Sequence, residues 1–227
     1  MTTSIFIRSY RNDFEWLAYC LRSCQKFTRG FSEIVVAVPY EDASLLSHLT
    51  AERVVKIAPV TQDGYLDQQI TKLYADLLCT SDYILHVDSD CIFDKDTTPE
   101  DFFVNKKPVM LWELNVDSPW PSITGCSLGW WENAEYMRRM PIIYPRWIYS
   151  AFRDWMQEKH GVPLSEWIAS QPFREFSEFN TLGQWARRFH NEAFTWAHPS
   201  DIPPHAKQFW SWGGVDEVRL QIENVLR

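Results

Sequence analysis

Two aspartates separated by a serine follow directly on an apolar segment of the chain. Residues 83–87 read YILHV, and Asp88, Ser89 and Asp90 come next. Carboxylate oxygens at this spacing suit Mg²⁺ or Mn²⁺, which are hard cations that keep coordination positions for phosphate oxygens. Aspartates are also common in turns after strands, where their side chains bond to the local backbone. The pair predicts a divalent-cation site, with a structural turn as the alternative.

The overall composition excludes several classes of protein. The 227 residues carry a formal net charge of −8 without a run of Lys or Arg, which argues against binding to nucleic acid. No apolar stretch is long enough to cross a bilayer, and the N-terminus lacks the pattern of a secretory signal. The five cysteines lack CxxC spacing, so free thiols are expected. We expect a soluble, cytoplasmic protein without membrane insertion.

Apolar strands that alternate with amphipathic helices position the acidic pair. We expect strands over residues 4–10, 33–39, 54–59 and 83–87, and helices over 12–27, 43–52 and 67–79. Asn12 and Glu15 are expected to form a capping box at the first helix. The alternation predicts an α/β fold with a mostly parallel central sheet flanked by helices. Such sheets bind ligands beyond the carboxyl ends of their strands, where the acidic pair stands.

The second half of the chain has a looser pattern. A strand is expected over 108–114, an irregular segment rich in Pro, Trp and Gly over 115–146, and helices over 146–160, 177–189 and 214–226. Within the irregular segment, residues 117–131 predict a substrate cleft or a mobile lid, with a purely structural loop as the alternative. The sequence has no convincing linker, so we interpret residues 1–227 as a single domain.

Three further polar residues lie near predicted helix starts. Gln69 and Lys72 stand early in the 67–79 helix, where anionic groups are favoured, and Lys72 could reach a phosphate. The competing interpretation of Lys72 is a solvated lysine on a helix surface. Glu178 follows Ser177, a candidate cap for the 177–189 helix, and the helix dipole stabilises a carboxylate there in any case.

Three segments together resemble glycosyltransferases of the GT-A fold: the SIFIRSY strand, the DGYLDQQITKL helix start and the LHVDSDCIF motif. The chain is similar in particular to the small glycosyltransferase domain encoded by large chlorella viruses, over about residues 1–110 and more loosely to about residue 210. The resemblance implies one GT-A-like, Rossmann-like domain. In it, residues 1–110 would bind a nucleotide sugar, and residues 111–227 would form a less regular acceptor side.

The resemblance also implies roles for individual residues. Arg8, Ser9 and Tyr10 would lie near the base and ribose of a uridine nucleotide, with Ser89 at the ribose. Asp88 and Asp90 would hold Mn²⁺ or Mg²⁺, often with a third ligand late in the chain, for which His198 and His205 are the candidates. Gln69 and Lys72 would contact the donor. Glu178 would be the general base of an inverting enzyme, or would position the acceptor or the reacting sugar in a retaining one.

The function expected from these features is metal-dependent transfer of a sugar from a UDP-sugar to a carbohydrate or glycan acceptor. Asp90 and Glu178 would carry the catalysis, in a monomer or weak homo-oligomer. A nucleotidyltransferase with a similar sheet and metal is one alternative, and an inactive carbohydrate-binding domain is another. The chain lacks GxxxxGK[ST] and a glycine-rich first turn, which argues against a P-loop kinase and a dinucleotide-binding enzyme.

Overall fold

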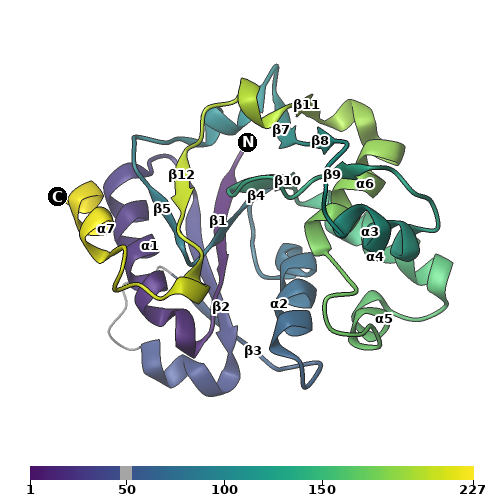
Figure 1. The fold of residues 1–227 in the computed structure, drawn as a ribbon, viewed down its shortest axis with the longest axis horizontal. Helices are drawn as coiled ribbons and strands as arrows, with labels where there is room; N and C mark the ends of the chain where they lie inside the picture. Colours follow the sequence, from purple (N-terminus) through teal and green to yellow (C-terminus); the bar gives the residue numbers. More distant parts are fainter. Residues whose placement is uncertain (47–52) are drawn as a thin grey trace.

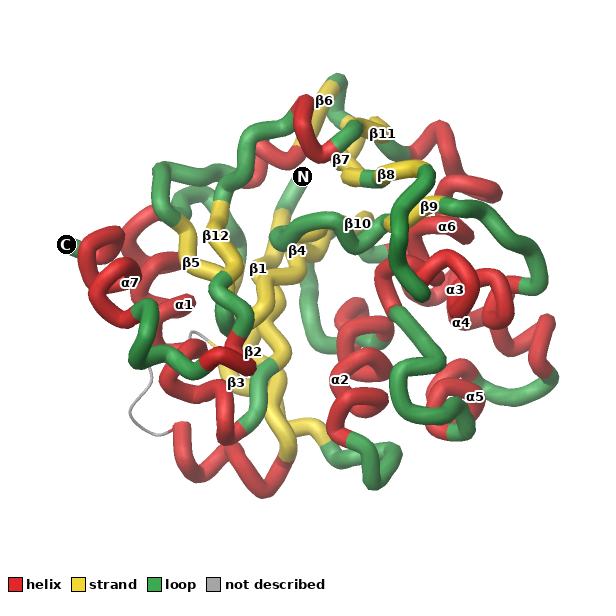
Figure 2. Tube along the Cα trace, viewed as in Figure 1, coloured by secondary structure: helices red, strands yellow, loops and turns green. Residues whose placement is uncertain are grey.

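A five-stranded, mostly parallel sheet forms the centre of the molecule (Figures 1 and 2). The computed structural model describes residues 1–46 and 53–227. The strands lie in the order β10-β4-β1-β2-β3, and every neighbouring pair is parallel except β10 with β4. The fold is therefore mixed α/β with a parallel-containing central sheet, as predicted. The strands are β1 (Thr3–Arg8), β2 (Glu33–Pro39), β3 (Arg53–Ile57), β4 (Tyr83–Asp88) and β10 (Ile142–Pro145).

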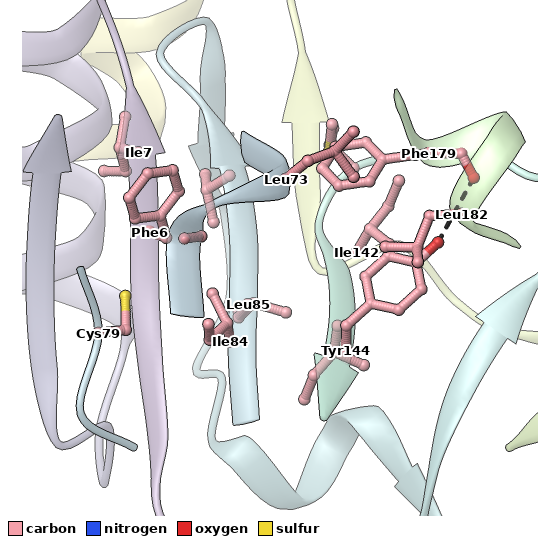
Figure 3. Close-up of a cluster of buried hydrophobic side chains, with 14 of the residues drawn as sticks. Phe6, Ile7, Leu73, Cys79, Ile84, Leu85, Ile142, Tyr144, Phe179 and Leu182 are labelled. Carbon is pink, nitrogen blue, oxygen red and sulfur yellow. Dashed lines mark hydrogen bonds between the residues drawn. The ribbon is translucent and has the colours of Figure 1, made fainter. Parts of the chain in front are cut away.

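Helices cover both faces of this sheet. Figure 1 shows α1 (Phe14–Phe27) on one face and α2 (Gly64–Leu73) on the other. The central strands are apolar in their middle residues, apart from the buried His86 of β4, as is typical of parallel strands buried on both faces. Phe6 and Leu85 of the strands pack in the core with Leu73 of α2 (Figure 3). This packing fixes α2 against the sheet.

Smaller elements complete the fold. None of the helices in the described part of the chain has the length and apolar character needed to cross a membrane. The remaining helices are α3 (Trp120–Leu128), α4 (Trp147–His160), α5 (Leu164–Ala169), α6 (Glu178–His190) and α7 (Arg219–Leu226). The short strands are β5 (Cys91–Phe93), β6 (Phe103–Val104), β7 (Lys107–Leu111), β8 (Glu113–Leu114), β9 (Ala134–Glu135), β11 (Thr195–Ala197) and β12 (Ala206–Gln208). The 3₁₀ turns are η1 (Arg11–Asp13), η2 (Tyr40–Leu46), η3 (Ala75–Leu77), η4 (Pro99–Phe102), η5 (Asn191–Ala193), η6 (Pro199–Asp201) and η7 (Ser211–Gly213).

Several predicted boundaries in the first half are corrected by the structure. The first strand ends at Arg8 and not at residue 10, and the predicted capping box is wrong, because the turn η1 precedes α1. Helix α2 begins earlier than predicted, since Asp63 accepts hydrogen bonds from the backbone of the first turn. It ends at Leu73, and η3 follows. The helix expected over 43–52 is a 3₁₀ turn as far as Leu46, and residues 47–52 lie outside the described residues.

The segment predicted to be irregular, 115–146, contains both a helix and a strand. Helix α3 tolerates its prolines because they precede it or stand in its first turn, where no backbone N–H is needed. Strand β10 joins the central sheet as its antiparallel edge. The predicted strand 108–114 is two strands, β7 and β8, and the final helix begins at Arg219 and not at residue 214. The prediction of an irregular segment, which relied on the proline and glycine content, was therefore wrong for this region.

Helix α6 is fixed tightly against the segment after β9. The side-chain oxygen Oδ1 of Asn180 accepts hydrogen bonds from the backbone N–H of Tyr136 at 2.7 Å and of Met137 at 3.3 Å. Gly183 lies one helical turn further, and a Cβ placed on it would stand 2.5 Å from Cβ of Tyr136. The close approach of the two backbones thus depends on the missing side chain.

We expect Gly183→Ala to lower the free energy of unfolding by about 1–3 kcal/mol, because the added methyl group overpacks the contact with Tyr136. Urea denaturation measures this change. Gly64→Ala is the matched control, because no atom lies within 4 Å of the corresponding Cβ. It should leave stability unchanged or raise it by up to about 1 kcal/mol. Equal stability of the two variants would contradict the packing described for α6.

Candidate functional site

The acidic pair lies at the carboxyl edge of the central sheet. Asp88 is the last residue of β4 and stands opposite Arg8, the last residue of β1, in the parallel ladder. Ser89 and Asp90 form the turn into β5, and both are buried. Ligands of parallel α/β sheets bind at this edge. The pair therefore stands where the strand pattern predicted it.

A buried lysine connects this edge to the second half of the chain. Lys72 of α2 is only 5% exposed, and its Nζ lies 2.9 Å from Oδ1 of Asp88 and 3.1 Å from Oε1 of Glu178. Burial alone would lower the pKa of Lys72, but the negative charges of Asp88 and Glu178 outweigh it and hold the pKa above its usual value. The alternative of a solvated surface lysine is therefore wrong.

Glu178 is positioned by α2 as well. Its backbone N–H, at the start of α6, donates a 3.0 Å hydrogen bond to Oε1 of Gln69, and the residue is only 3% exposed. The amide Nε2 of Gln69 is buried and has no hydrogen-bond partner among the described residues. Gln69 and Lys72, which lie about one helical turn apart on α2, thus form one cluster with Asp88 and with Glu178, which stands 109 residues after Gln69 in the sequence. Sequence reasoning had named all four separately.

Asp90 is held by residues 208–213, which run from the last residue of β12 to the end of η7 and which we call the 208–213 strap. The backbone N–H of Ser211 donates to Oδ2 of Asp90 at 2.9 Å, and Nε2 of Gln208 donates to Oδ1 at 3.2 Å. The N–H of Phe209 donates to the carbonyl oxygen of Asp90 at 3.0 Å. Burial and the charge of Asp88 nevertheless raise the pKa of Asp90. These contacts are those expected of a purely structural turn, which was the alternative to a divalent-cation site. Each carboxylate oxygen nevertheless has a second lone pair with which it could bind a cation.

A third carboxylate joins the acidic pair, and the sequence did not single it out. Asp13 ends the turn η1, and burial, followed by the charge of Asp90, raises its pKa to about 6. Contacts with Ser211 and Ser89 oppose this rise. The available signal was its place shortly after the first strand, because the carboxyl ends of parallel strands share one edge. Asp13 thus adds a third acidic group near Asp90.

A cavity of about 580 Å³ opens at the ends of β1, β2 and β3, and Arg8 in its wall is the ladder neighbour of Asp88. Its lining includes Arg8, Ser9 and Tyr10, the three residues that were expected to contact a nucleotide. Arg11 also lines it and forms a 2.6 Å ion pair with Asp42, which the sequence did not reveal because the two residues lie on different turns. The volume lies within the range of small-molecule sites.

Two polar groups at the cavity are buried without protein partners. Nε of Arg8 and Oγ of Ser9 make no hydrogen bond within residues 1–46 and 53–227, although another nitrogen of Arg8 donates to the carbonyl of Ser9. Burial lowers the pKa of Arg8, while the charges of Asp67 and Asp42 oppose the shift. Buried polar groups are nearly always satisfied, so both atoms are exceptions to that rule.

Tyr65 links the cavity to the lysine cluster. The side chain lines the cavity, and burial, followed by the charge of Glu178, raises its pKa to about 12. A contact with Gln69 acts in the opposite direction. A ligand in the cavity would therefore lie next to the cluster of Lys72, Asp88 and Glu178.

The two late histidines do not join the acidic pair. His198 is exposed, contacts Ser200 and lies 3.9 Å from Glu113, whereas His205 packs against Phe102. Within the described residues, no three His, Cys, Asp or Glu side chains form a group that could hold a metal ion. A cation at the acidic pair would therefore need further ligands from water or from a bound substrate.

The chain matches no known protein-family model and no curated protein sequence. What the site can do must therefore be argued from its own groups. The site pairs the buried ammonium group of Lys72 with the buried carboxylate of Glu178. It also contains an acidic corner, which consists of Asp13, Asp88 and Asp90, and a cavity whose wall includes residues with unpaired polar atoms. This set can bind a phosphorylated ligand, balance its charge and move a proton.

We expect Lys72→Met to destabilise the fold by about 3–5 kcal/mol at neutral pH, because it leaves the carboxylate of Glu178 buried without its counterion. Urea denaturation measures the change. The double variant Lys72→Met/Glu178→Gln should regain most of the loss, since no unpaired buried charge remains at residue 178. A double variant as unstable as the single one would contradict this assignment.

The same variant gives a pH test with a defined sign. Because the pKa of Lys72 is raised in the folded protein, its stabilising effect is complete below the unfolded lysine pKa of about 10.4 and disappears as the pH rises through the higher folded value. The stability difference between wild type and Lys72→Met should thus be constant from about pH 7 to about pH 9 and shrink above about pH 10.5. A difference independent of pH would exclude the raised pKa.

Proposed function

We propose that this protein is a metal-dependent glycosyltransferase that transfers a sugar from a UDP-sugar to a carbohydrate or glycan acceptor. The observation that carries the proposal is the meeting of Asp88, Lys72 and Glu178 beside a cavity with orphaned polar groups. These residues come from three elements in both halves of the chain, and sequence reasoning linked each of them to nucleotide-sugar chemistry. Charge pairing alone would not require a neighbouring polar cavity.

The donor nucleotide is assigned to the cavity. A uridine there would place its base and ribose against Arg8, Ser9 and Tyr10, and the buried Nε of Arg8 and Oγ of Ser9 would turn toward it to form hydrogen bonds. The diphosphate would then extend toward Asp88, which stands next to Arg8 across the ladder. Gln69, which contacts both Tyr65 and Glu178, would contribute its amide to the donor sugar or phosphate.

The acidic pair is assigned to the cation. Asp88 and Asp90 would hold Mn²⁺ or Mg²⁺ together with donor phosphate oxygens, and Asp13 adds a third negative charge nearby. When bound, such a cation supplies Lewis-acid stabilisation of a diphosphate leaving group. His198 is no longer needed in this proposal, because the substrate can complete the shell.

The protein's own groups account for the rest of the reaction. Lys72 places a positive charge beside Asp88, on the side where negative charge develops on the departing diphosphate. If transfer inverts the anomeric centre, Glu178 accepts the proton of the acceptor hydroxyl as the new glycosidic bond forms and the bond to the diphosphate breaks. In a retaining reaction the same carboxylate positions the acceptor or the reacting sugar. Its pairing with Lys72 keeps it ionised while buried.

The proposal extends to the fold and the location. The strand order β3-β2-β1-β4, with a ligand edge at the carboxyl ends, supports a GT-A, Rossmann-like domain with a donor half and an acceptor half. All five cysteines are free, and four of them are buried, which favours a reducing compartment such as the cytoplasm.

We expect Asp90→Asn to reduce metal-dependent UDP release from UDP-sugars by about a hundredfold, because it removes a charge that stabilises the transition state. A screen of UDP- and GDP-sugars with Mn²⁺ measures UDP or GDP release. Asp154→Asn, a substitution of an exposed aspartate on α4, is the matched control and should leave the rate unchanged.

Three outcomes of this screen would reject sugar transfer. Full activity in EDTA would remove the cation from the proposal. Pyrophosphate release from a nucleoside triphosphate and a sugar phosphate would indicate a nucleotidyltransferase. Carbohydrate binding that survives Asp90→Asn, with no turnover of any donor, would indicate a binding domain without catalysis.

We expect Ser9→Ala to weaken UDP binding about three- to tenfold while leaving thermal stability unchanged or higher. The reason is that Oγ of Ser9 is buried without a partner, so its removal costs the free protein nothing and costs the complex a hydrogen bond. Calorimetry with UDP and Mn²⁺, together with a thermal melt, gives both values. Unchanged UDP affinity would place the nucleotide elsewhere.

A further inference from the structure

The 208–213 strap carries two tryptophans that the protein itself does not bury. Trp210 is 57% exposed and Trp212 is 80% exposed, and their ring centroids lie 5.7 Å apart. Both flank Ser211, whose backbone N–H holds Asp90. Figure 2 shows the turn η7 beyond the lower end of β12, on the side of the molecule that carries α1 and α7. The strap thus fixes an aromatic pair beside the acidic corner.

The backbone of Trp210 is strained. Its φ of 59° and ψ of 90° lie in the left-handed region, where a bulky residue is a clear outlier and glycine is favoured. A side chain that tolerates this cost usually gains packing in return. The ring of Trp210 instead contacts only its exposed neighbour Trp212 among the ring contacts of the described residues. Strain without burial indicates a functional constraint on the side chain.

Resting on the proposed function, we propose that Trp210 and Trp212 form the binding platform for the acceptor, and that the acceptor is a neutral pyranoside. The aromatic faces would pack against the C–H face of the sugar ring, as aromatic side chains do with apolar surfaces. Hydroxyl groups of the sugar that do not react would meet the carboxylate of Asp13, which contacts Ser211 between the two tryptophans.

The local chemistry favours this occupant over others. Two side chains offer far less area than the roughly 1,000 Å² that a specific protein interface needs. The carboxylates of Asp13, Asp88 and Asp90, in a chain of net charge −8, repel anionic lipids and acidic saccharides. A neutral sugar combines an apolar face with hydroxyl donors, and both find partners here. The hydrogen bonds of the strap to Asp90 keep the platform in register with the reaction site.

Two variants and one control test the platform on the full chain. Trp210→Gly removes the ring and relieves the strained φ, and Trp212→Ala removes the second ring. The control, Trp147→Ala, removes an exposed tryptophan beside Tyr83, at the opposite end of β4. The probes are methyl β-glucopyranoside, cellobiose and lactose as neutral sugars and glucuronic acid as the anionic one. Tryptophan fluorescence and saturation-transfer NMR report binding, while thermal melts report stability and calorimetry with Mn²⁺ reports UDP binding.

We expect at least one neutral sugar to bind wild type and Trp147→Ala, with glucuronic acid weaker. Trp210→Gly and Trp212→Ala should each raise the dissociation constant about tenfold or more. Trp210→Gly should melt at or above the wild-type temperature, whereas a structural role of the ring would lower it. The platform is overturned if no neutral sugar binds wild type, if the Trp210 and Trp212 variants bind as wild type does, or if Trp210→Gly melts lower.

The UDP measurement separates the two proposals. If wild type binds UDP with Mn²⁺ but the Trp210 and Trp212 variants bind the neutral sugar as wild type does, the platform is rejected and the transferase proposal is retained. If sugar binding depends on the two tryptophans but wild type does not bind UDP, the transferase fails, and the acceptor role of the platform fails with it.

Discussion

The pairing of the buried Lys72 ammonium group with Asp88 and Glu178 is the constraint on which the rest of the site depends. A charge removed from water is tolerated only when opposite charges and hydrogen bonds replace its hydration. Lys72 therefore ties α2, the end of β4 and the start of α6 to one point. Through this point the first half of the chain determines where the second half places its carboxylate.

The polar groups near Lys72 fall into two classes, those with hydrogen-bond or ion-pair partners in the protein and those without. Lys72 and Glu178 are satisfied within the protein, whereas the free groups of Arg8, Ser9 and Gln69 at or beside the cavity are not. The first set is preorganised and needs no ligand to hold its position. In the proposed complex, the second set would gain hydrogen bonds from the donor nucleotide. This division is what a site needs if it must hold its geometry before the substrate binds.

The 208–213 strap is shared between Asp90 and the proposed acceptor platform. Its donors hold both oxygens of Asp90, and the same turn carries the exposed Trp210 and Trp212. One short segment thereby contacts Asp90 and also carries the two tryptophans proposed to bind the acceptor. In the proposed transfer, the donor side is built by the strand ends and α2, and the acceptor side by this strap.

The sequence by itself determined the parallel core, because uninterrupted apolar runs such as 33–39 and 83–87 have few other stable environments, and it placed Asp88 and Asp90 at the strand end. It also nominated Lys72, Gln69 and Glu178 from helix starts, but without indicating that they touch. Only the tertiary structure decided that contact, the nearness of Asp13, the bonds of Ser211 to Asp90 and the separation of His198 from the acidic pair. The physical reason is that periodicity and capping act over a few residues, whereas pairing of buried charges acts across elements whose docking depends on the packing of the whole core.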